Sequence, residues 1–419
     1  MTDWAKDPAD EKNLRLYVPG EGWRAYADVV GEDEKVAATG SKHLIESGLL
    51  NGLNATNLLL LTGAGSSFAA KNPAGKPQPA GMASLWAAVQ TNTGQERFQG
   101  ICTTFSSAPI GENIERLLTL CKLYLELNEK DESTKTKDIS KFVKEAEQTI
   151  LATVNFIDSD TKLDAHEIVI QKIGRRSMRK PRARLFTTNY DLCFEEAARR
   201  HRFTIIDGFS HALDQVYDRA HFNYDIVRRE QGKDAPDYIE NVFHLYKLHG
   251  SIDWRRLKSG EIVRSRGTDG EPVLIYPRSS KYQESFEAPY LDMIGALQTA
   301  LREPDTALVI SGFGFNDDHL SRPVLAAVES NMSLRVIVCD PIFLAKDSLV
   351  KNDHTISADP NTDNKFIKAF FRLAKAGDPR VHLLNGRFDD LALALPDLVG
   401  ETDRERHAAR MRTIWEDKD

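Results

Sequence analysis

Residues 58–67 read Leu-Leu-Leu-Leu-Thr-Gly-Ala-Gly-Ser-Ser, an unbroken apolar run that leads directly into small residues. A continuously apolar run is typical of a strand buried on both faces, as in a parallel sheet covered by helices. The small residues that follow allow backbone N–H groups to approach a phosphate without side chains in the way. We therefore expect Gly63, Ala64, Gly65 and Ser66 to form a phosphate-binding loop at the carboxyl end of a strand.

The loop departs from the two best-known phosphate-binding patterns. The dinucleotide fingerprint has a third glycine where Phe68 stands, and an acidic residue about 20 positions further on. The P-loop has a Gly-Lys-Ser/Thr sequence, which does not follow here. Taken alone, the glycines also fit a tight turn that only packing requires, although we favour the phosphate loop.

Further β-rich runs recur between longer amphipathic stretches of the chain. They cover residues 184–188, 204–207, 242–248, 272–276, 307–311, 334–339 and 381–384. Between them, helical spacing places residues such as Ile114, Leu117 and Leu118 on one face of a helix. Strands that alternate with helices predict a parallel sheet of the α/β class.

Composition adds a few exclusions. The 419 residues include 55 Lys and Arg against 62 Asp and Glu, a net charge of −7. This balance argues against a protein that coats nucleic acid or an anionic membrane through bulk charge. No run approaches the roughly 18 apolar residues of a membrane helix, and the polar first residues do not resemble a secretion signal. We expect a cytoplasmic protein without membrane contact.

The cysteines stand alone in the sequence, at Cys102, Cys121, Cys193 and Cys339. None of them forms a Cys-x-x-Cys pair, so the sequence supports neither a disulfide scaffold nor a structural zinc site. No metal ligands are therefore expected.

Periodicity and charge suggest how the chain is divided. Residues 1–50 show no strong alternation and are expected to form a helical appendage. A highly charged stretch marks the start of a mainly helical insertion at about 128–183, within a main unit that spans 51–400. Residues 401–419 read as a charged tail. The basic run 175–184 fits either a solvated helix end or a docking patch for a partner or nucleic acid.

Two polar clusters follow predicted strands, where α/β sheets bind ligands. Asn189 and Asp191 follow the strand at 184–188, although either side chain could simply cap the next helix. His249 ends the strand at 242–248 and precedes a glycine, a context in which a His can be presented to a cleft. His244 lies within the same strand and is a weaker candidate.

A second strand-to-glycine junction occurs late in the chain. Ser311, Gly312 and Gly314 follow the strand at 307–311 and suit the other half of a dinucleotide. Asp340 follows the strand at 334–339, where its carboxylate could accept from ribose or adenine groups. An Asp-Pro pair more often begins a turn, and we favour that interpretation slightly.

Taken in order, the four motifs resemble the sirtuin superfamily. They are G-A-G-S-S, T-T-N-Y-D, K-L-H-G-S-I-D and S-G-F-G-F-N-D-D. The resemblance is to the prokaryotic sirtuin-like branch rather than to the protein deacylases, and it extends from about Leu58 to about Leu398. Secondary features of the branch are Glu112-Asn-Ile-Glu115, Ile275-Tyr-Pro277 with Lys281-Tyr282, and Asp317-Asp318-His319.

The resemblance implies a Rossmann-like parallel sheet with helices on both faces and a smaller helical module. It implies that 51–400 is a catalytic domain whose substrate is NAD, cleaved between nicotinamide and ribose. His249 would be the catalytic His, with Asn189 and Asp191 at the nicotinamide and its ribose. The expected NAD-binding residues are Gly63, Ala64, Gly65, Ser66, Ser311, Gly312, Gly314 and, aligned less securely, Asp340.

One departure from the family pattern bears on the activity. Deacylating sirtuins hold a zinc ribbon made of two Cys-x-x-Cys pairs, and the present sequence has none, so zinc is not expected. Members without the ribbon resemble NAD glycohydrolases of antiviral defence, in which NAD depletion halts an infected cell. The alternatives are an NAD-dependent deacylase, or a non-catalytic nucleotide-binding module that assembles with an ATPase. The resemblance also implies a homo-oligomer or a partner such as a HerA-like ATPase.

Overall fold

The computed structural model describes most of the chain. The described residues are 8–31, 34–78, 81–108, 110–213, 215–229, 237–265, 267, 269–274, 288–345, 348–349 and 353–398. The charged tail expected at 401–419 lies outside them, as do Ile275-Tyr-Pro277 and Lys281-Tyr282.

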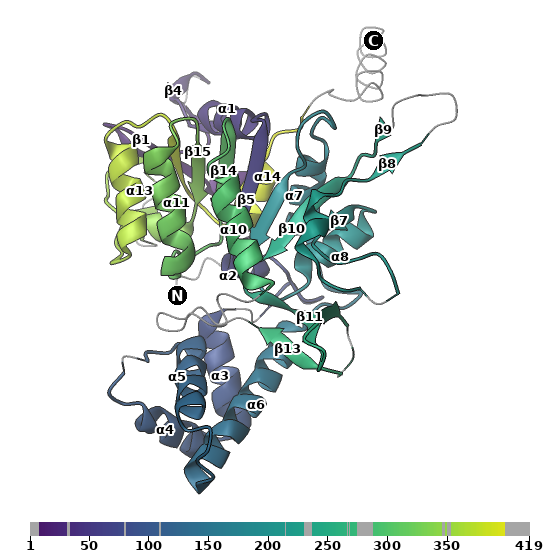
Figure 1. Ribbon diagram of the computed structural model, residues 1–419. Coiled ribbons are helices and arrows are strands. Elements are labelled where there is room, and N and C mark those ends of the chain that lie inside the picture. Colours follow the sequence, from purple (N-terminus) through teal and green to yellow (C-terminus); the bar gives the residue numbers. More distant parts are fainter. Residues whose placement is uncertain are drawn as a thin grey trace.

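A ten-stranded sheet forms the centre of the molecule (Figure 1). In spatial order its strands are β16 (Thr355–Ile356), β2 (Gly22–Ala25), β1 (Arg15–Val18), β17 (Val381–Asn385), β15 (Arg335–Cys339), β14 (Thr306–Ser311), β5 (Asn57–Thr62), β6 (Arg184–Thr187), β10 (Val242–Lys247) and β7 (Thr204–Ile206). Every pairing from β17 to β7 is parallel, whereas β1, β2 and β16 join antiparallel. The expected α/β fold with a Rossmann-like, mostly parallel sheet is confirmed.

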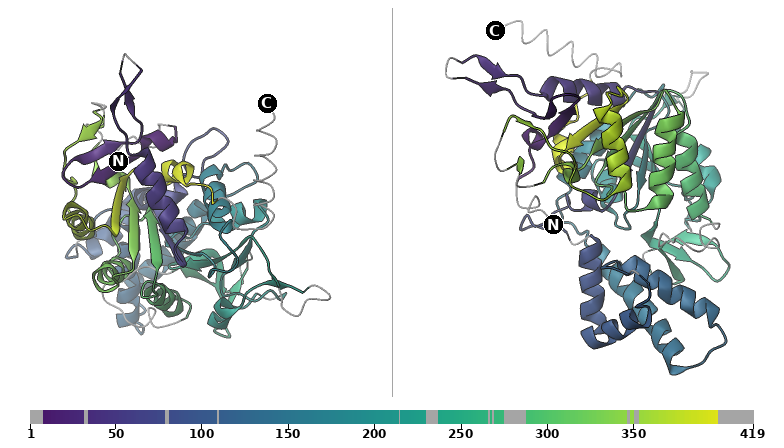
Figure 2. Two further views of the ribbon diagram at one scale, coloured as in Figure 1. Left: turned by 90° about the horizontal axis from the view of Figure 1, so that it is seen from above. Right: turned by 90° about the vertical axis from the view of Figure 1, so that its left-hand side faces the viewer.

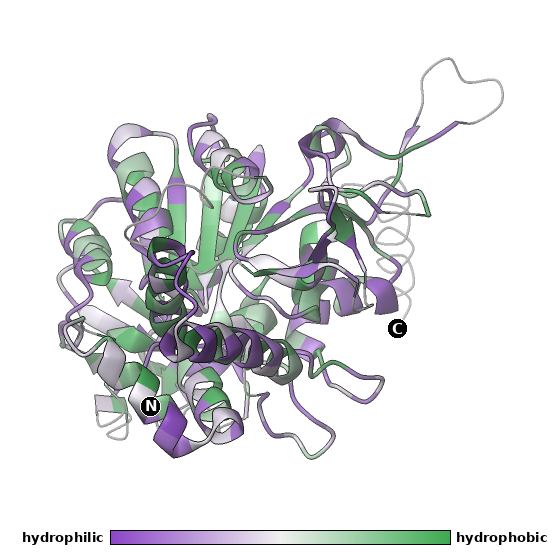
Figure 3. Cartoon of the chain, turned by 60° about the horizontal axis from the view of Figure 1, so that its bottom comes forward, coloured by the Kyte–Doolittle hydropathy of each residue, from purple (hydrophilic) through white to green (hydrophobic). Residues whose placement is uncertain are grey.

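The central strand β5 is buried on both faces, as its apolar run predicts. Leu58 and Leu60 belong to one hydrophobic core, and Leu59 and Leu61 belong to the other, because successive side chains alternate across a strand. The first core is covered by α1 (Lys42–Leu53), α7 (Asp164–Gly174), α8 (Cys193–Arg200) and α14 (Phe388–Ala394). The second is covered by α10 (Tyr290–Ala300), α11 (Asp318–Ser330) and α13 (Lys365–Lys375). Figure 3 shows that the central strands are apolar, whereas the helices around them carry both apolar and polar residues.

A separate helical module lies beyond the carboxyl ends of the strands (Figures 1 and 2). It consists of α3 (Met82–Thr93), α4 (Gln95–Thr104), α5 (Ile114–Leu127) and α6 (Thr134–Val154), which share a third hydrophobic core with Tyr190, Leu192, Ile252 and Leu274 of the sheet unit. The module thus begins before the insertion expected at 128–183 and ends before α7, which packs on the sheet. The charged stretch near residue 130 is only the loop between α5 and α6, so its charge reflects solvent exposure rather than a domain boundary.

The first 50 residues differ from the helical appendage expected there. β1 pairs with β17 and β2 pairs with β1, so this segment extends the main sheet, with Trp23 fully buried. β3 (Val29–Val30) and β4 (Val36–Ala38) form a projecting hairpin (Figure 2), and α1 begins only at Lys42. These strands have two to four residues, too few for alternation to be recognised.

Smaller elements complete the described structure. β11 (Gly250–Arg256) pairs with β12 (Ile262–Arg264) and β13 (Glu271–Leu274), and β8 (Val227–Arg228) pairs with β9 (Asp237–Tyr238). The short helices are α2 (Ala64–Ser67), η2 (Glu11–Asn13), η3 (Arg219–Asn223) and η4 (Pro341–Phe343). Among the described residues, no helix has the length and apolar character needed to cross a membrane.

Within the basic run 175–184, several charges have partners inside the protein. The buried Arg176 guanidinium donates to the backbone carbonyls of Leu53, Ala55 and Thr56. Arg175, Arg182 and Arg184 form ion pairs with acidic side chains. These contacts favour a structural role for the run over a docking patch.

Replacing Arg176 with Met should lower the free energy of unfolding by about 2–3 kcal/mol, because three carbonyls would lose their buried donor. Urea denaturation measures the change. The matched control is Arg179→Met, whose exposed side chain should contribute less than about 0.5 kcal/mol. Equal midpoints for the two variants would show that Arg176 does not hold these carbonyls.

Candidate active site

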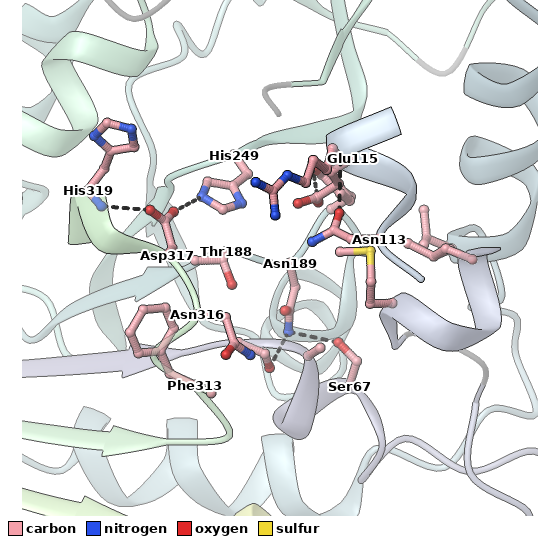
Figure 4. A pocket seen from close by; sticks show the side chains of 18 of the residues that line it. Ser67, Asn113, Glu115, Thr188, Asn189, His249, Phe313, Asn316, Asp317 and His319 are labelled. Carbon is pink, nitrogen blue, oxygen red and sulfur yellow. Dashed lines mark hydrogen bonds and ion pairs between the residues drawn. The ribbon is translucent and has the colours of Figure 1, made fainter. Parts of the chain in front are cut away.

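A cavity of about 620 Å³ opens at the carboxyl ends of the central strands and faces the helical module (Figure 4). β5 has β6 as its neighbour on one side and β14 as its neighbour on the other, so the strand order reverses at β5. The cavity lies at this point, which is the usual ligand position in open α/β sheets. The residues lining it are Gly63, Ala64, Ser67, Met82, Leu85, Asn113, Glu115, Arg116, Thr119, Val154, Thr188, Asn189, Tyr190, Asp191, His249, Phe313, Gly314, Asn316, Asp317, Asp318 and His319.

The two predicted glycine loops touch each other behind the cavity. Gly65 N–H donates to the Gly312 carbonyl at 2.9 Å. A Cβ on Gly65 would lie 2.5 Å from Gly312 Cα, and one on Gly312 would lie 2.5 Å from Ser66 N. Gly312 also has a φ of +68°, a conformation that L side chains rarely adopt. Gly65 and Gly312 are therefore required by packing, whereas Gly63 and Gly314 line the cavity.

Asn189 connects the loop after β6 to the glycine loop. Its buried Nδ2 donates to the Gly63 carbonyl at 2.9 Å, to Ser66 Oγ at 3.0 Å and to Ser67 Oγ at 2.7 Å. Figure 4 shows the side chain directed toward Ser67. Asn189 thus fixes the glycine loop that is expected to bind phosphate.

Asp191 lines the cavity and also accepts a hydrogen bond from the first residue of a helix. One carboxylate oxygen accepts from Ser67 Oγ, and the other accepts from the N–H of Cys193, the first residue of α8, at 3.0 Å. Asp191 therefore both bonds to the start of α8 and lies where it could contact a ligand.

Lys247 holds the loop that carries Asn189 from the neighbouring strand. This Lys is 2% exposed, and its Nζ donates to the carbonyls of Tyr190 and Asp191 and to Glu195 Oε1. Burial raises the pKa of Glu195, and the Lys247 charge opposes that shift. No local sequence pattern marks Lys247 as a site residue, although it lies two residues before His249.

His249 forms a pair with Asp317, the N-cap of α11. His249 Nε2 and Asp317 Oδ2 are 3.0 Å apart, and both side chains are buried. Burial acts to raise the pKa of Asp317, but the hydrogen bond and charge of His249 hold it below its ordinary value. Asp317 Oδ2 can accept a hydrogen bond from the Nε2–H group of His249, which orients the imidazole ring at the edge of the cavity.

Glu115 reaches the cavity from the helical module. The Tyr190 hydroxyl donates to Glu115 Oε1 at 2.9 Å. Burial raises the pKa of Glu115, and the nearby His249 and the Tyr190 hydroxyl oppose this effect. Glu115 and Asp317 were both quoted within family motifs, but neither was predicted as a site residue.

Five predicted site residues do not line the cavity: Gly65, Ser66, Ser311, Gly312 and Asp340. Ser66 and the two glycines shape the loops from behind. Ser311 is buried at the end of β14. The Asp340 side chain accepts from the Ile342 N–H at 2.9 Å and caps η4, which fits the turn interpretation; burial raises its pKa to about 7.

Metal binding was not expected from the sequence. Within the described ranges, no group of three or more His, Cys, Asp or Glu side chains comes together around a possible metal position. The expectation of no zinc remains a prediction.

Comparison with known families supports the class of the fold and site. A family model described as SIR2-like domain matches residues 183–358. The match includes Asn189, His249 and Asp317, and the glycine loop at 63–67 precedes it. It supports the sirtuin-like superfamily and indicates an NAD-related activity. No curated protein matches the chain.

Gly312→Ala should weaken NAD binding at least about tenfold, because the new Cβ would push Ser66 N and the glycine loop apart. Titration calorimetry with NAD measures the change. The control is Gly377→Ala, which has a φ of +81° but no atom within 4 Å of the added Cβ. The control should cost about 1–2 kcal/mol of stability and leave affinity unchanged. Equal affinities of the two variants would contradict the role of the loop contact.

Proposed function

We propose that the protein is an NAD glycohydrolase, which cleaves NAD to nicotinamide and ADP-ribose. The observation that carries the proposal is the convergence of Asn189, Asp191 and the His249–Asp317 pair on one cavity beside the glycine loop. The SIR2-like match and the absence of paired cysteines in the sequence support NAD as substrate without the zinc ribbon of deacylases.

The chemistry requires few groups. Nicotinamide leaves as a neutral molecule from a cationic ring, so the leaving group needs no general acid. The ribosyl centre becomes oxocarbenium-like, as in other glycosyl transfers, and one face must admit water. His249, oriented by Asp317, is the general base for that water, a role that contributes about 10²- to 10⁴-fold.

Asn189 and Asp191 have separate tasks in this mechanism. Because Asn189 Nδ2 is bonded to the glycine loop, its amide oxygen is the atom with which it would position water or a ribose hydroxyl. Asp191 would bind the ribose or carboxamide and supply negative potential to the developing cation. Gly63, Ala64 and Gly314 would lie along the pyrophosphate and ribose.

His249→Ala and Asn189→Ala should each abolish nicotinamide release while the protein stays folded, because each removes a group at the reacting atoms. The measurement is chromatography of nicotinamide, ADP-ribose and acetyl-ADP-ribose after incubation with NAD, with and without an acetylated peptide. The control is His244→Ala, in the same strand β10 but away from the cavity, which should retain turnover.

The same assay separates the alternatives. Acetyl-ADP-ribose formed only with the peptide would identify a deacylase. NAD binding without any product would identify a nucleotide-binding module. Full turnover by folded His249→Ala would refute the assignment of the base.

The family resemblance supports a role as an NAD-depleting effector of prokaryotic antiphage defence. Such an effector has to be restrained in a healthy cell, which supports regulation by homo-oligomerisation or by a partner such as a HerA-like ATPase. Light scattering of the full chain, alone and with a candidate ATPase, tests both forms of assembly.

In cells that carry the protein with any partner, phage infection should lower cellular NAD and reduce plaque numbers, since free NAD is consumed when the enzyme is released from restraint. The His249→Ala strain should keep its NAD and lose protection, whereas His244→Ala should behave as wild type. Protection that persists in the His249→Ala strain would separate defence from NAD hydrolysis.

A further inference from the structure

Among the described residues that line the cavity, four have carboxylates: Glu115, Asp191, Asp317 and Asp318. Three of the four are committed to partners within the protein. Asp191 accepts from a serine hydroxyl and a backbone N–H, and Asp317 is paired with His249. Asp318 forms ion pairs with an Arg and a Lys. Asp317 and Asp318 therefore already face basic side chains, and both oxygens of Asp191 already accept hydrogen bonds.

Glu115 has a different environment. One of its oxygens accepts from the Tyr190 hydroxyl, and among the described residues no Lys or Arg forms an ion pair with it. Burial raises the pKa of Glu115, His249 and the Tyr190 hydroxyl oppose this rise, and Asp317 adds to it, so a neighbouring positive charge would favour the carboxylate form. A cation that entered the cavity would supply the missing charge.

The position of Glu115 is held from two sides. It lies in the first turn of α5, whose N-terminus is capped by Asn113 and favours a negative charge. The Tyr190 hydroxyl ties it to the loop that carries Asn189. His249 is close enough for its charge to act on the Glu115 carboxylate. The carboxylate is thus held at the same end of the cavity as the proposed base (Figure 4).

We propose that the Glu115 carboxylate binds the positively charged nicotinamide ring of NAD+ and makes the cavity prefer NAD+ to the neutral ring of NADH. The inference rests on the proposed function, since it requires the nicotinamide end of the dinucleotide to lie beside His249. Coulomb attraction to a largely buried carboxylate distinguishes two ligands of similar shape by their charge. The helical module therefore supplies a specificity-determining residue to a site otherwise built on the sheet.

The test compares Glu115→Gln with wild type for affinity toward two ligands. One is carba-NAD+, which keeps the cationic ring but resists cleavage, and the other is NADH. Glu115→Gln keeps the side-chain shape and should weaken carba-NAD+ about tenfold while leaving NADH within about twofold, a loss of about 1.4 kcal/mol for the cation alone. The matched control is Glu112→Gln, an exposed residue of the same motif, which should alter neither affinity.

The outcomes separate this inference from the proposed function. A variant that weakens both ligands equally, or neither, overturns the role of Glu115 as a charge selector. If the variant behaves in either of these ways while the wild-type protein releases nicotinamide from NAD, the glycohydrolase proposal stands and only the role of Glu115 is refuted. If wild type binds neither dinucleotide, both proposals fall.

Discussion

The backbone contact between the two glycine loops determines the geometry of the cavity. β5 and β14 are parallel neighbours with Thr62 opposite Ser311, so their loops leave the sheet at the same level. The loops can pass each other only because Gly65 and Gly312 lack side chains, since either Cβ would lie 2.5 Å from the other loop. Asn189 then bonds to the loop after β5, which attaches the end of a third strand to the same point.

The buried side chain of Lys247 holds the loop that carries Asn189. Lys247 lies opposite Thr187 in the register of β10 and β6, so its ammonium group reaches the carbonyls after β6. Burial of a charge is costly unless it is paired and hydrogen-bonded, and Glu195 supplies the opposite charge. Because His249 follows two residues later, the base and the Asn189 loop are positioned by adjacent parts of one strand end.

Sequence patterns anticipated the features that depend on local order. The unbroken apolar runs predicted β5, β6, β10, β14, β15 and β17 within a residue or two, because strands buried on both faces leave that signature. The polar strand ends were found because parallel strands present their carboxyl ends at one edge. Asp340 shows the limit of that rule, since its carboxylate caps η4 away from the cavity. The short strands of the first 50 residues left no pattern to recognise.

Features that depend on tertiary contact were not accessible from local patterns. Glu115 bonds to Tyr190 and Asp317 bonds to His249 across long stretches of sequence, so only tertiary packing brings these side chains together. The expected insertion at 128–183 does not coincide with the helical module. Charge marks exposed loops, whereas the extent of the module follows from the hydrophobic core that α3 to α6 share. Since the module contributes Glu115, the electrostatic environment of His249 depends on where the module sits.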